Sequence, residues 1–369
     1  MKKITFVGDI SFSGDYDFNM PKFDYSVLDS FYEQHCGDEL LIGNLETVFT
    51  DSNVPINKYG PSLRSSPSCA AALSGFDFLS LANNHCNDFG LGALKETQLA
   101  LFNARCDVMG VMFEDSDYSV VEVLESIFVI AASEREFNLY RDYGYGAQHF
   151  DVIELITKIR DVKSRNDRAK VILFLHAGIE YYNLPSPELV KKARALVDFG
   201  ADAVLFSHTH VIGPTETYKG VPICYGLGNF LFPPGDGSSQ PGMVATLNVA
   251  QSQIELEVDF VTAHGDGQVG HVCSEEKARL LQGLSRLSDI VLSEQALADN
   301  FVKLLNEHGG YYRNATFLNV IFPGIHRLVK CFRLDGLLVP ATSVARRLNM
   351  ISCESHHEVI SASLRRMLK

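Results

Sequence analysis

The sequence predicts an α/β fold on two observations. Over the first two thirds of the chain, short apolar or β-branched runs alternate with amphipathic stretches, and polar clusters follow several runs directly. Alternating strands and helices are typical of α/β domains, whose ligands lie beyond the carboxyl ends of the strands. With 369 residues, 46% hydrophobic and 21% charged, the chain is long enough to bury a sizeable core.

A series of runs has the length and composition of strands. In chain order they are Ile4–Val7, Glu39–Ile42, Phe76–Leu81, Ser119–Val123, Ile127–Ala131, Val171–Leu175, Ala203–Phe206, Pro222–Tyr225, Met243–Val249 and Ile254–Val261. Helical spacing of apolar residues between them predicts helices at Leu91–Asn103, Val152–Lys163 and Glu188–Phe199. Gly200 follows the last of these, where a glycine commonly closes a helix.

The pattern changes near residue 265. Beyond the loop His264–Gly267, the segments Glu275–Leu292, Glu294–Glu307 and Val339–Arg347 carry apolar residues at helical spacing, and convincing strands become scarce. We therefore expect two parts, residues 1–265 and a mainly helical extension at 266–369. The extension could cap the site or form a homodimer.

Charge and apolar patterning exclude several classes of protein. The chain has 32 Lys and Arg against 45 Asp and Glu, a formal net charge of −13, which argues against nucleic acid as a partner. An anionic substrate would need local compensation, which bound divalent cations could provide. No run approaches the roughly 18 to 20 apolar residues of a membrane span, and the N-terminus becomes charged too early for a signal peptide. We therefore expect a cytoplasmic protein without a membrane span.

The spacing of the cysteines and the absence of common catalytic motifs argue against further classes of protein. The eight cysteines form neither a Cys-x-x-Cys pair nor a dense cluster, so we expect no disulfide framework and no zinc knuckle. A Gly-x-Ser-x-Gly elbow, a Walker loop and a Gly-x-Gly-x-x-Gly fingerprint are also absent from the sequence, which argues against serine hydrolases and nucleotide-binding proteins.

Acidic and amide side chains follow the first two runs. Gly8 and Asp9 come directly after Ile4–Val7, and Asn44 and Glu46 come after Glu39–Ile42. Carboxylate oxygens are suitable ligands for Mg, Mn, Fe or Zn, and Asn44 could orient its neighbours or contact substrate. Taken alone, Asp9 could equally cap the next segment.

The third cluster, residues 83–88, reads Asn-Asn-His-Cys-Asn-Asp and follows Phe76–Leu81. The amide oxygen of Asn84 can bind a metal, and His85 can protonate a leaving group without occupying the metal. Asp88, three residues further on, could orient His85. The alternative interpretation is an Asx-rich turn before a helix.

Histidines follow two later runs. His176, with Glu180 four residues on, follows Val171–Leu175, and His208 and His210 follow Ala203–Phe206. His176 alone could be a core histidine, whereas residues two apart in an extended segment point in opposite directions and can serve two metals, or a metal and a substrate. Five such clusters together predict a dinuclear centre, in which two ions about 3.5 to 4 Å apart activate water and stabilise an oxyanion.

The order of these motifs resembles that of the CapA family, a branch of the calcineurin-like metallophosphatases associated with poly-γ-glutamate and polysaccharide capsules. The motifs are Gly-Asp, Asn-Leu-Glu, Asn-Asn-His, His-x-Gly-x-Glu and His-x-His, with Gly-Asn-Phe at 228–230. The resemblance covers residues 4–262 and implies a four-layer αββα sandwich, followed by the helical extension.

The resemblance also implies roles for individual residues. The implied ligands of two divalent ions, Mn, Zn, Fe or Mg, are Asp9, Glu46, Asn84, His176, His208 and His210. His85 would be the general acid, with Glu180 and Asn229 nearby. Ordinary metallophosphatases have Asp-x-His where this chain has Asp9-Ile10-Ser11, and Gly-Asp before the bridging position where it has Asn44-Leu45-Glu46. One imidazole is therefore missing, so the site could hold only one ion.

The implied activity is metal-dependent hydrolysis, most directly of a phosphoester in capsule or cell-surface polymer biosynthesis. Amide or ester hydrolysis on a capsule polymer and a non-catalytic role in polymer assembly remain alternatives. The expected substrate is an anionic or phosphorylated small molecule or polymer precursor. Lys58 and Arg64, in the loop Pro55–Pro67, are the cations expected to bind it, with Asn44, Glu180 and Asn229 as further substrate contacts.

Overall fold

Two β-sheets packed face to face form the centre of the computed structural model, which describes residues 2–13, 25–35, 37, 39–114, 116–233, 240–263, 267–308 and 341–367. The first sheet, in spatial order, is β18 (Val269–His271), β17 (Ile254–Ala263), β16 (Gly242–Val249), β1 (Lys2–Ile10), β2 (Glu39–Leu45), β5 (Phe78–Ser80) and β6 (Asp107–Met109), and β15 (Asn229–Leu231) also pairs with β1. Strands β1, β2, β5 and β6 are parallel, whereas β16 to β18 are antiparallel to their neighbours.

The second sheet has six strands and a parallel centre. Its order is β13 (Thr215–Tyr218), β14 (Val221–Cys224), β12 (Ala203–Ser207), β11 (Lys170–His176), β9 (Ile127–Ser133) and β8 (Val121–Leu124). Two short pairs lie outside the large sheets: β3 (Val48–Phe49) with β4 (Arg64–Ser65), and β7 (Val111–Met112) with β10 (Gly146–Ala147).

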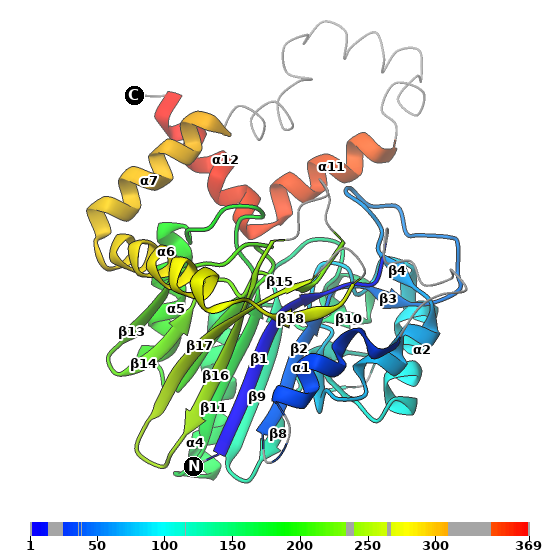
Figure 1. Ribbon diagram of the computed structural model, residues 1–369. Helices are drawn as coiled ribbons and strands as arrows, with labels where there is room; N and C mark the ends of the chain where they lie inside the picture. The colour runs from blue at the N-terminus through cyan, green and yellow to red at the C-terminus, as the bar shows by residue number, and fades with distance from the viewer. Residues whose placement is uncertain are drawn as a thin grey trace, which may run out of the picture.

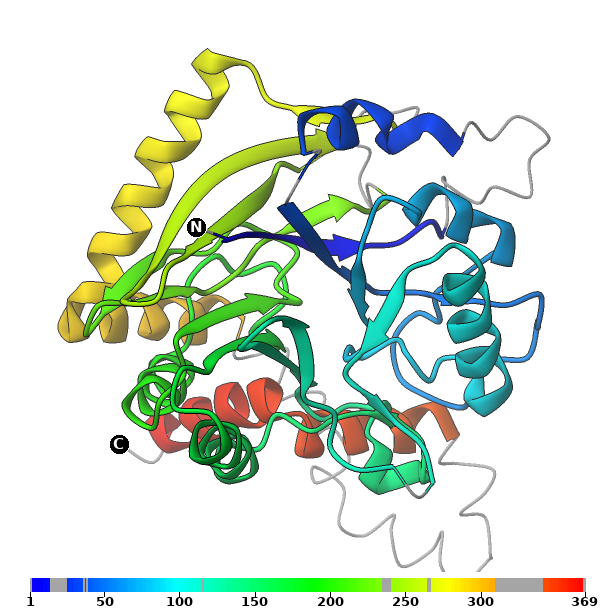
Figure 2. The same cartoon turned by 90° about the horizontal axis from the view of Figure 1, so that it is seen from below.

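Helices cover the outer faces of the sandwich (Figures 1 and 2). In the described part of the chain, the 3₁₀ helices are η2 (Tyr25–Leu28) and η3 (Pro67–Leu73), and the α-helices are α1 (Asp29–Gln34), α2 (Gly90–Asn103), α3 (Tyr140–Tyr143), α4 (Val152–Arg165), α5 (Pro187–Asp198), α6 (Ser274–Leu292), α7 (Glu294–Glu307), α11 (Ala341–Ser352) and α12 (Glu354–Met367). This is the four-layer αββα arrangement that the resemblance implied.

Strand β11 explains why the layers pack as they do. Ile172 and Phe174 belong to the core between the sheets, where the Phe174 ring meets the edge of Phe6 from β1 at a centroid distance of 5.3 Å. Leu173 and Leu175 point to the other face and pack with residues of α4 and α5, because side chains alternate along a strand. A parallel strand buried on both faces needs a nearly continuous apolar run, which is what the sequence has here.

The strands and helices expected from the sequence are present, apart from residues 339 and 340, which lie outside the described residues. The short strands β3, β4, β6, β7, β10, β13, β15 and β18 were not predicted, since two to four residues carry too little pattern to be recognised. Strand β18 pairs with β17 and lies beyond residue 265, so the first sheet takes its edge strand from the part of the chain expected to be helical.

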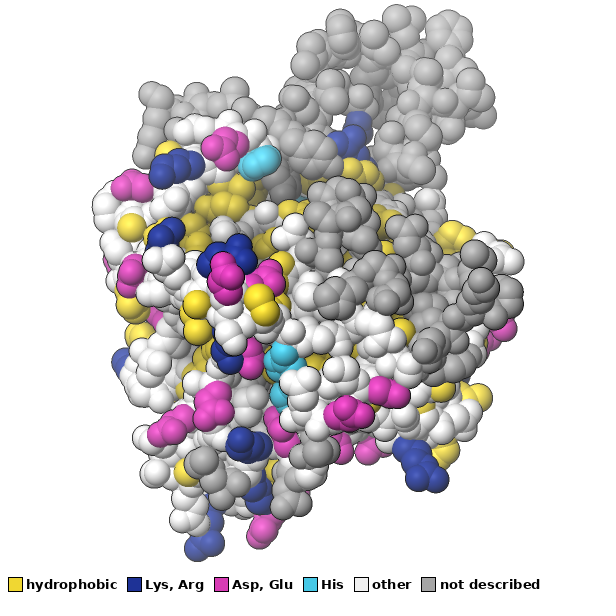
Figure 3. All heavy atoms as spheres, in the orientation of Figure 1, with side chains coloured by type: hydrophobic (Ala, Val, Ile, Leu, Met, Phe, Trp, Pro, Cys, Tyr) yellow, Lys and Arg dark blue, Asp and Glu magenta, His cyan; other side chains and the backbone are white. Residues whose placement is uncertain are grey.

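The last two helices lie across one end of the sandwich. Figure 1 shows α11 and α12 over the end at which β1, β2 and β11 finish. Among the described residues, no helix combines the length and the apolar character needed to cross a membrane. On the face drawn in Figure 3, acidic and basic side chains of the described residues are interspersed.

Gly8 allows β1 to approach the chain before β15, and this gives a first prediction. A Cβ atom at Gly8 would lie 1.8 Å from the carbonyl oxygen of Gly228, which accepts a hydrogen bond from the amide of Asp9. We expect Gly8→Ala to lower the free energy of unfolding by about 2 kcal/mol or more. The measurement is urea denaturation followed by circular dichroism.

Gly283→Ala is the matched control, because a Cβ atom there meets no other atom within 4 Å and the residue lies inside α6. Alanine should stabilise that helix by up to about 1 kcal/mol. Equal stability of Gly8→Ala and the wild type would contradict the close approach at Gly8.

Candidate metal centre

The candidate site lies where strand ends of the two sheets meet. In the first sheet, Asp9 is paired in register with Asn44 of β2 on one side and with Asn229 of β15 on the other. In the second sheet, His176 is in register with Ser207 of β12. The parallel registers therefore bring polar side chains that are far apart in the sequence to one edge of the sandwich.

Glu46, the first residue after β2, is the central acidic group of this edge. Its side chain is fully buried, and neither carboxylate oxygen has a hydrogen-bond partner among the described residues. Oε1 lies 3.8 Å from Nε2 of His85, 3.6 Å from Nε2 of His176 and 3.8 Å from Nε2 of His210. These distances are too long for hydrogen bonds. Burial, with a contribution from Asp9, raises the pKa of Glu46 well above its usual value.

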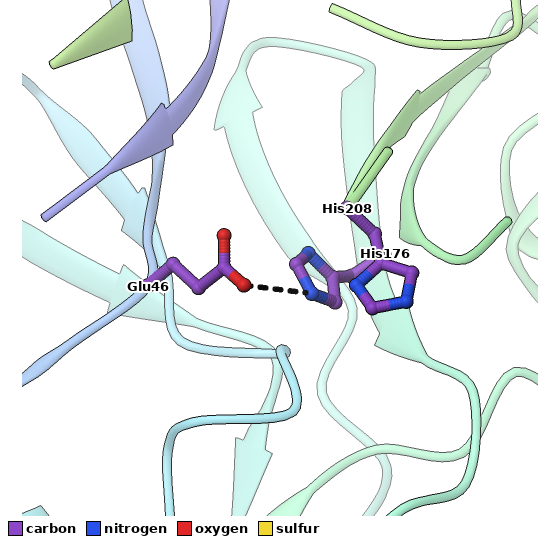
Figure 4. Close-up of side chains that lie close together, drawn as sticks. All are labelled: Glu46, His176 and His208. Atoms are coloured by element: carbon purple, nitrogen blue, oxygen red, sulfur yellow. Dashed lines mark ion pairs between the residues drawn. The ribbon is translucent and has the colours of Figure 1, made fainter. Parts of the chain in front are cut away.

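The spacing around Glu46 fits a cation. Two ligand atoms each about 2.1 Å from one tetrahedral ion lie about 3.4 Å apart, close to the separations observed. Ligand atoms of Glu46, His176 and His208 lie within 4.8 Å of one another, and so do those of Asp9, Glu46 and His210. Figure 4 shows the Glu46 carboxylate facing the imidazoles of His176 and His208. The two groups share Glu46.

Asp9 is held by neighbours from both sheets. Asn44 donates from Nδ2 to Oδ1 at 2.8 Å, and the backbone amide of His208 donates to Oδ2 at 3.1 Å. Nδ1 of His210 lies 3.6 Å from Oδ2. Burial raises the pKa of Asp9, and the nearby His210 opposes that rise. Asn44 thus orients a carboxylate, one of the two tasks that the sequence suggested for it.

His176 is a buried imidazole with polar contacts at both nitrogens. Nε2 lies 3.0 Å from Oδ1 of Asn84, and Nδ1 lies 3.0 Å from Oγ of Ser207. Burial, reinforced by His208 and His210, lowers the pKa of His176 well below its usual value. The neutral imidazole, which is the form that binds metals, is therefore favoured.

His208 and His210 occupy a tight turn after β12. Both have positive φ, 91° and 57°, a strained backbone that is common at functional sites. His208 joins the group with Glu46 and His176, whereas His210 joins the group with Asp9 and Glu46. Nδ1 of His210 lies 2.9 Å from Oδ1 of Asn229, so its Nε2 is directed to Glu46. The two histidines serve different ligand groups.

Glu134 is a neighbour of His208 that the sequence reasoning missed. Its Oε1 lies 3.1 Å from Nε2 of His208. Burial alone would lower the pKa of His208, but Glu134, together with Glu180 and Glu136, outweighs burial and raises the pKa to about 9. Glu134 comes directly after β9, so the rule that located the other clusters at strand ends would also have located it.

His85 is oriented by Asp88. Nδ1 of His85 lies 2.7 Å from Oδ2 of Asp88, which also accepts the backbone amide of Leu63 at 2.6 Å. Lys58 pairs with the other oxygen of Asp88, and its Nζ lies 3.3 Å from Nδ1 of His85. Burial and Lys58 lower the pKa of His85, and Asp88 opposes them. Nε2 is left facing the ligand groups.

A pocket of about 340 Å³ opens beside these groups. Its lining combines residues that the sequence predicted for the site with residues that it did not predict. The lining includes Lys58, Tyr59, Asn84, His85, Glu136, Glu180, Tyr181, His210, Phe232, Asn349, Met350 and His356. Arg64 is not part of this lining, and its guanidinium lies 6.0 Å from the centre of the Phe89 ring. Asn349, Met350 and His356 come from α11 and α12, so the C-terminal helices form part of the wall.

Two packed sheets with carboxylate, amide and imidazole groups gathered at one edge define an α/β sandwich protein with a candidate metal centre. More specifically, the chain belongs to the family described as bacterial capsule synthesis protein PGA_cap, whose model matches residues 3–234. This confirms the resemblance found in the sequence. The matched segment contains every site residue from Asp9 to Asn229, whereas α11 and α12 lie outside it.

Curated relatives agree with the family. The chain is 34% identical over 178 residues to the capsule biosynthesis protein CapA of Bacillus anthracis, a match that covers 44% of this chain and 41% of the relative. It is 30% identical over 167 residues to the PGA biosynthesis protein CapA of Bacillus subtilis strain 168, covering 43% of each. The chain thus matches less than half the length of these relatives.

Similarity to solved structures is weaker. The protein TT1561 of Thermus thermophilus aligns with 69% of this chain and 98% of its own, at 11% identity and a TM-score of 0.38. A likeness at this level carries no argument about activity.

The unpaired Glu46 carboxylate gives a prediction for metal-free protein. Below pH 4.5, the usual pKa of a glutamate, the group is neutral whether the chain is folded or not. As the pH rises from there towards the raised pKa of the folded state, Glu46 ionises more readily in the unfolded chain than in the folded one, so the wild type loses stability. Glu46→Gln cannot ionise and does not lose this stability. At pH 8, with metal removed by a chelator, the variant should be more stable by roughly 2 kcal/mol or more, and at pH 5 the gap should shrink.

The measurement is thermal denaturation of both proteins at the two pH values, with and without Mn²⁺. Mn²⁺ should stabilise the wild type and close the gap at pH 8, because it stabilises only a state that binds it. Glu257→Gln, at an exposed position of β17, is the control and should follow the wild type. Identical melting of Glu46→Gln and wild type at pH 8 without metal would contradict the unpaired carboxylate.

Proposed function

We propose that the protein is a metal-dependent hydrolase that cleaves a phosphoester in capsule or cell-surface polymer biosynthesis. The observation that carries this proposal is the position of His85. Its Nε2 lies 3.8 Å from Oε1 of Glu46, on the wall of the pocket, while Asp88 holds Nδ1. A group that can transfer a proton thus stands directly beside the candidate ligands. Membership of a capsule synthesis family supports the biological setting.

The residues fit two divalent ions, Mn, Zn, Fe or Mg, with Glu46 shared between them. Asp9, Glu46 and His210 would hold one, and Glu46, His176 and His208 the other, with Asn84 next to His176. When bound, such ions neutralise charge that develops on the substrate and activate water. The buried, unpartnered oxygens of Glu46 are the reason for proposing that cations belong here.

The surrounding side chains have distinct tasks in this proposal. His85 gives its Nε2 proton to the leaving oxygen, and its lowered pKa makes the protonated ring a stronger donor. Asp88 and Lys58 fix the orientation of that ring. Asn44 positions Asp9, and Asn229 positions His210, so both amides act through a ligand and not through the substrate. Glu180 lies on the pocket wall, where it can contact substrate.

Amide or ester hydrolysis on a capsule polymer is the second candidate, and the charges of the pocket favour it. Glu136 and Glu180 both line the pocket, whereas Lys58 is paired with Asp88 and Arg64 is not in the lining. A phosphate would therefore be attracted mainly by bound ions. A carbonyl substrate, being neutral at the reacting group, has less need of side-chain cations.

Replacing His85 tests catalysis. We expect His85→Ala to lower kcat by about 10² to 10⁴ and to leave metal content unchanged, because the ring transfers a proton without being a proposed ligand. The assay follows hydrolysis of p-nitrophenyl phosphate, bis(p-nitrophenyl) phosphate and γ-glutamyl p-nitroanilide in Mn²⁺. Elemental analysis of the same samples gives the number of ions.

The substrate series separates the candidates, since release from the anilide alone would select amide chemistry. His308→Ala, at an exposed histidine after α7, is the control and should keep full activity. A wild type that binds metal and hydrolyses none of the three would count against catalysis and favour a role in polymer assembly.

A further inference from the structure

Glu134 connects the candidate metal centre to the C-terminal helix α12. The carboxylate is almost fully buried, with 1% of the residue exposed. Oε1 lies 3.1 Å from Nε2 of His208, an ion-pair contact without hydrogen-bond geometry, and Oε2 accepts a hydrogen bond from Oγ of Ser355 at 2.6 Å. The backbone amide of Glu134 donates to the carbonyl of His176 at 3.0 Å, so the main chain is fixed on the neighbouring strand end.

The other nitrogen of His208 is available to a ligand. Nδ1 is buried and has no hydrogen-bond partner among the described residues. It belongs to the side chain that groups with Glu46 and His176 within 4.8 Å. A histidine that binds a metal through one ring nitrogen usually donates the N–H of the other to a carboxylate, which fixes both the tautomer and the ring orientation. Glu134 is the carboxylate nearest to Nε2 of His208, and its Oε1 has no hydrogen-bond partner of its own among the described residues.

Helix α12 is anchored directly before this contact. Glu354, the residue before Ser355, accepts the backbone amide of Arg135 at 2.7 Å, and its other oxygen lies 2.8 Å from Nε2 of His149. Cys353 is buried at the junction of α11 and α12. The start of α12 is thus held against the segment that carries Glu134, and Ser355 is presented to the carboxylate.

We propose that Glu134 is a positioning residue for the metal ligand His208, and that α12 holds Glu134 in place through Ser355. This rests on the metal site proposed above and extends it, since α12 lies outside the residues matched by the family model. The competing explanation is that Glu134 and Ser355 only attach the helix to the domain. A metal titration distinguishes the two, because attachment alone does not change affinity for an ion.

The experiment is isothermal titration of Zn²⁺ into the metal-stripped full-length chain. Glu134→Ala should weaken binding by about 10- to 100-fold, as is typical when the carboxylate behind a ligand histidine is removed. Glu134→Gln should lose less, because its amide oxygen can still accept from Nε2 of His208. Ser355→Ala should weaken binding in the same direction but less than Glu134→Ala, since it removes only one support of the carboxylate.

Glu358→Gln is the matched control. Glu358 lies on the same helix and accepts a hydrogen bond from Ser186, away from Glu134. The Glu358→Gln substitution should lower the melting temperature of the protein without changing its affinity for Zn²⁺. If Glu134→Ala does not fold, the isosteric Glu134→Gln decides, and long-range ¹H–¹⁵N spectra of the Zn²⁺-loaded protein should then show an altered Nε2 resonance of His208.

Two results would overturn the proposal in different ways. Wild-type affinity in both Glu134 variants, with lowered melting temperatures, would leave the metal site intact and reduce Glu134 to a structural contact. A wild type that binds no Zn²⁺ would remove the proposed metal site itself. Because binding is measured without substrate, a failure to find turnover does not affect either conclusion.

Discussion

Burial of the Glu46 carboxylate is the interaction on which the arrangement of the site depends. A buried charge without a partner costs several kcal/mol, and neither oxygen of Glu46 has one among the described residues. Three imidazole nitrogens surround Oε1 at 3.6 to 3.8 Å, too far to compensate it by hydrogen bonding. The fold therefore concentrates carboxylate and imidazole groups where either a proton or a bound cation relieves the cost of burying Glu46.

The position of Glu46 is set by the sandwich and not by its own loop. The ligand groups combine residues of both sheets, Asp9 and Glu46 from the first with His176, His208 and His210 from the second. The distance between them consequently follows from how β1 packs on β11, where Phe6 meets Phe174. Protein cores are close-packed and transmit displacements, so a change in this core would be felt at the strand ends. The core contacts between the two sheets therefore determine both the stability of the fold and the spacing of the ligand groups.

The sequence was sufficient to locate the site residues whose positions follow from a local pattern. Asp9, Glu46, His85 and His176 each lie within a few residues after an apolar run, and parallel strands bring such ends together. Glu134 follows the same rule but was missed, because the expected strand stopped at Ala131 whereas β9 continues to Ser133. Arg64 was expected near the substrate from its place in the chain, yet its side chain lies over Phe89, and the direction of a surface side chain is not encoded by spacing.

The C-terminal contribution could not be found from the sequence for a different reason. Asn349, Met350 and His356 reach the pocket because two helices dock across the end of the sandwich, and docking depends on tertiary contacts with no local signal. The homodimer expected as an alternative use of these helices stays a prediction.

Neighbouring residues of one helix turn meet two parts of the same centre. Ser355 contacts the carboxylate behind His208, and His356 lies on the wall of the pocket. Successive residues of a helix project about 100° apart, so both contacts hold only while α12 keeps one position and one rotation. A displacement of α12 would then change the pocket wall and the support of His208 together. In the proposed site, α12 therefore links the pocket wall to the support of His208, through a segment that the family model does not include.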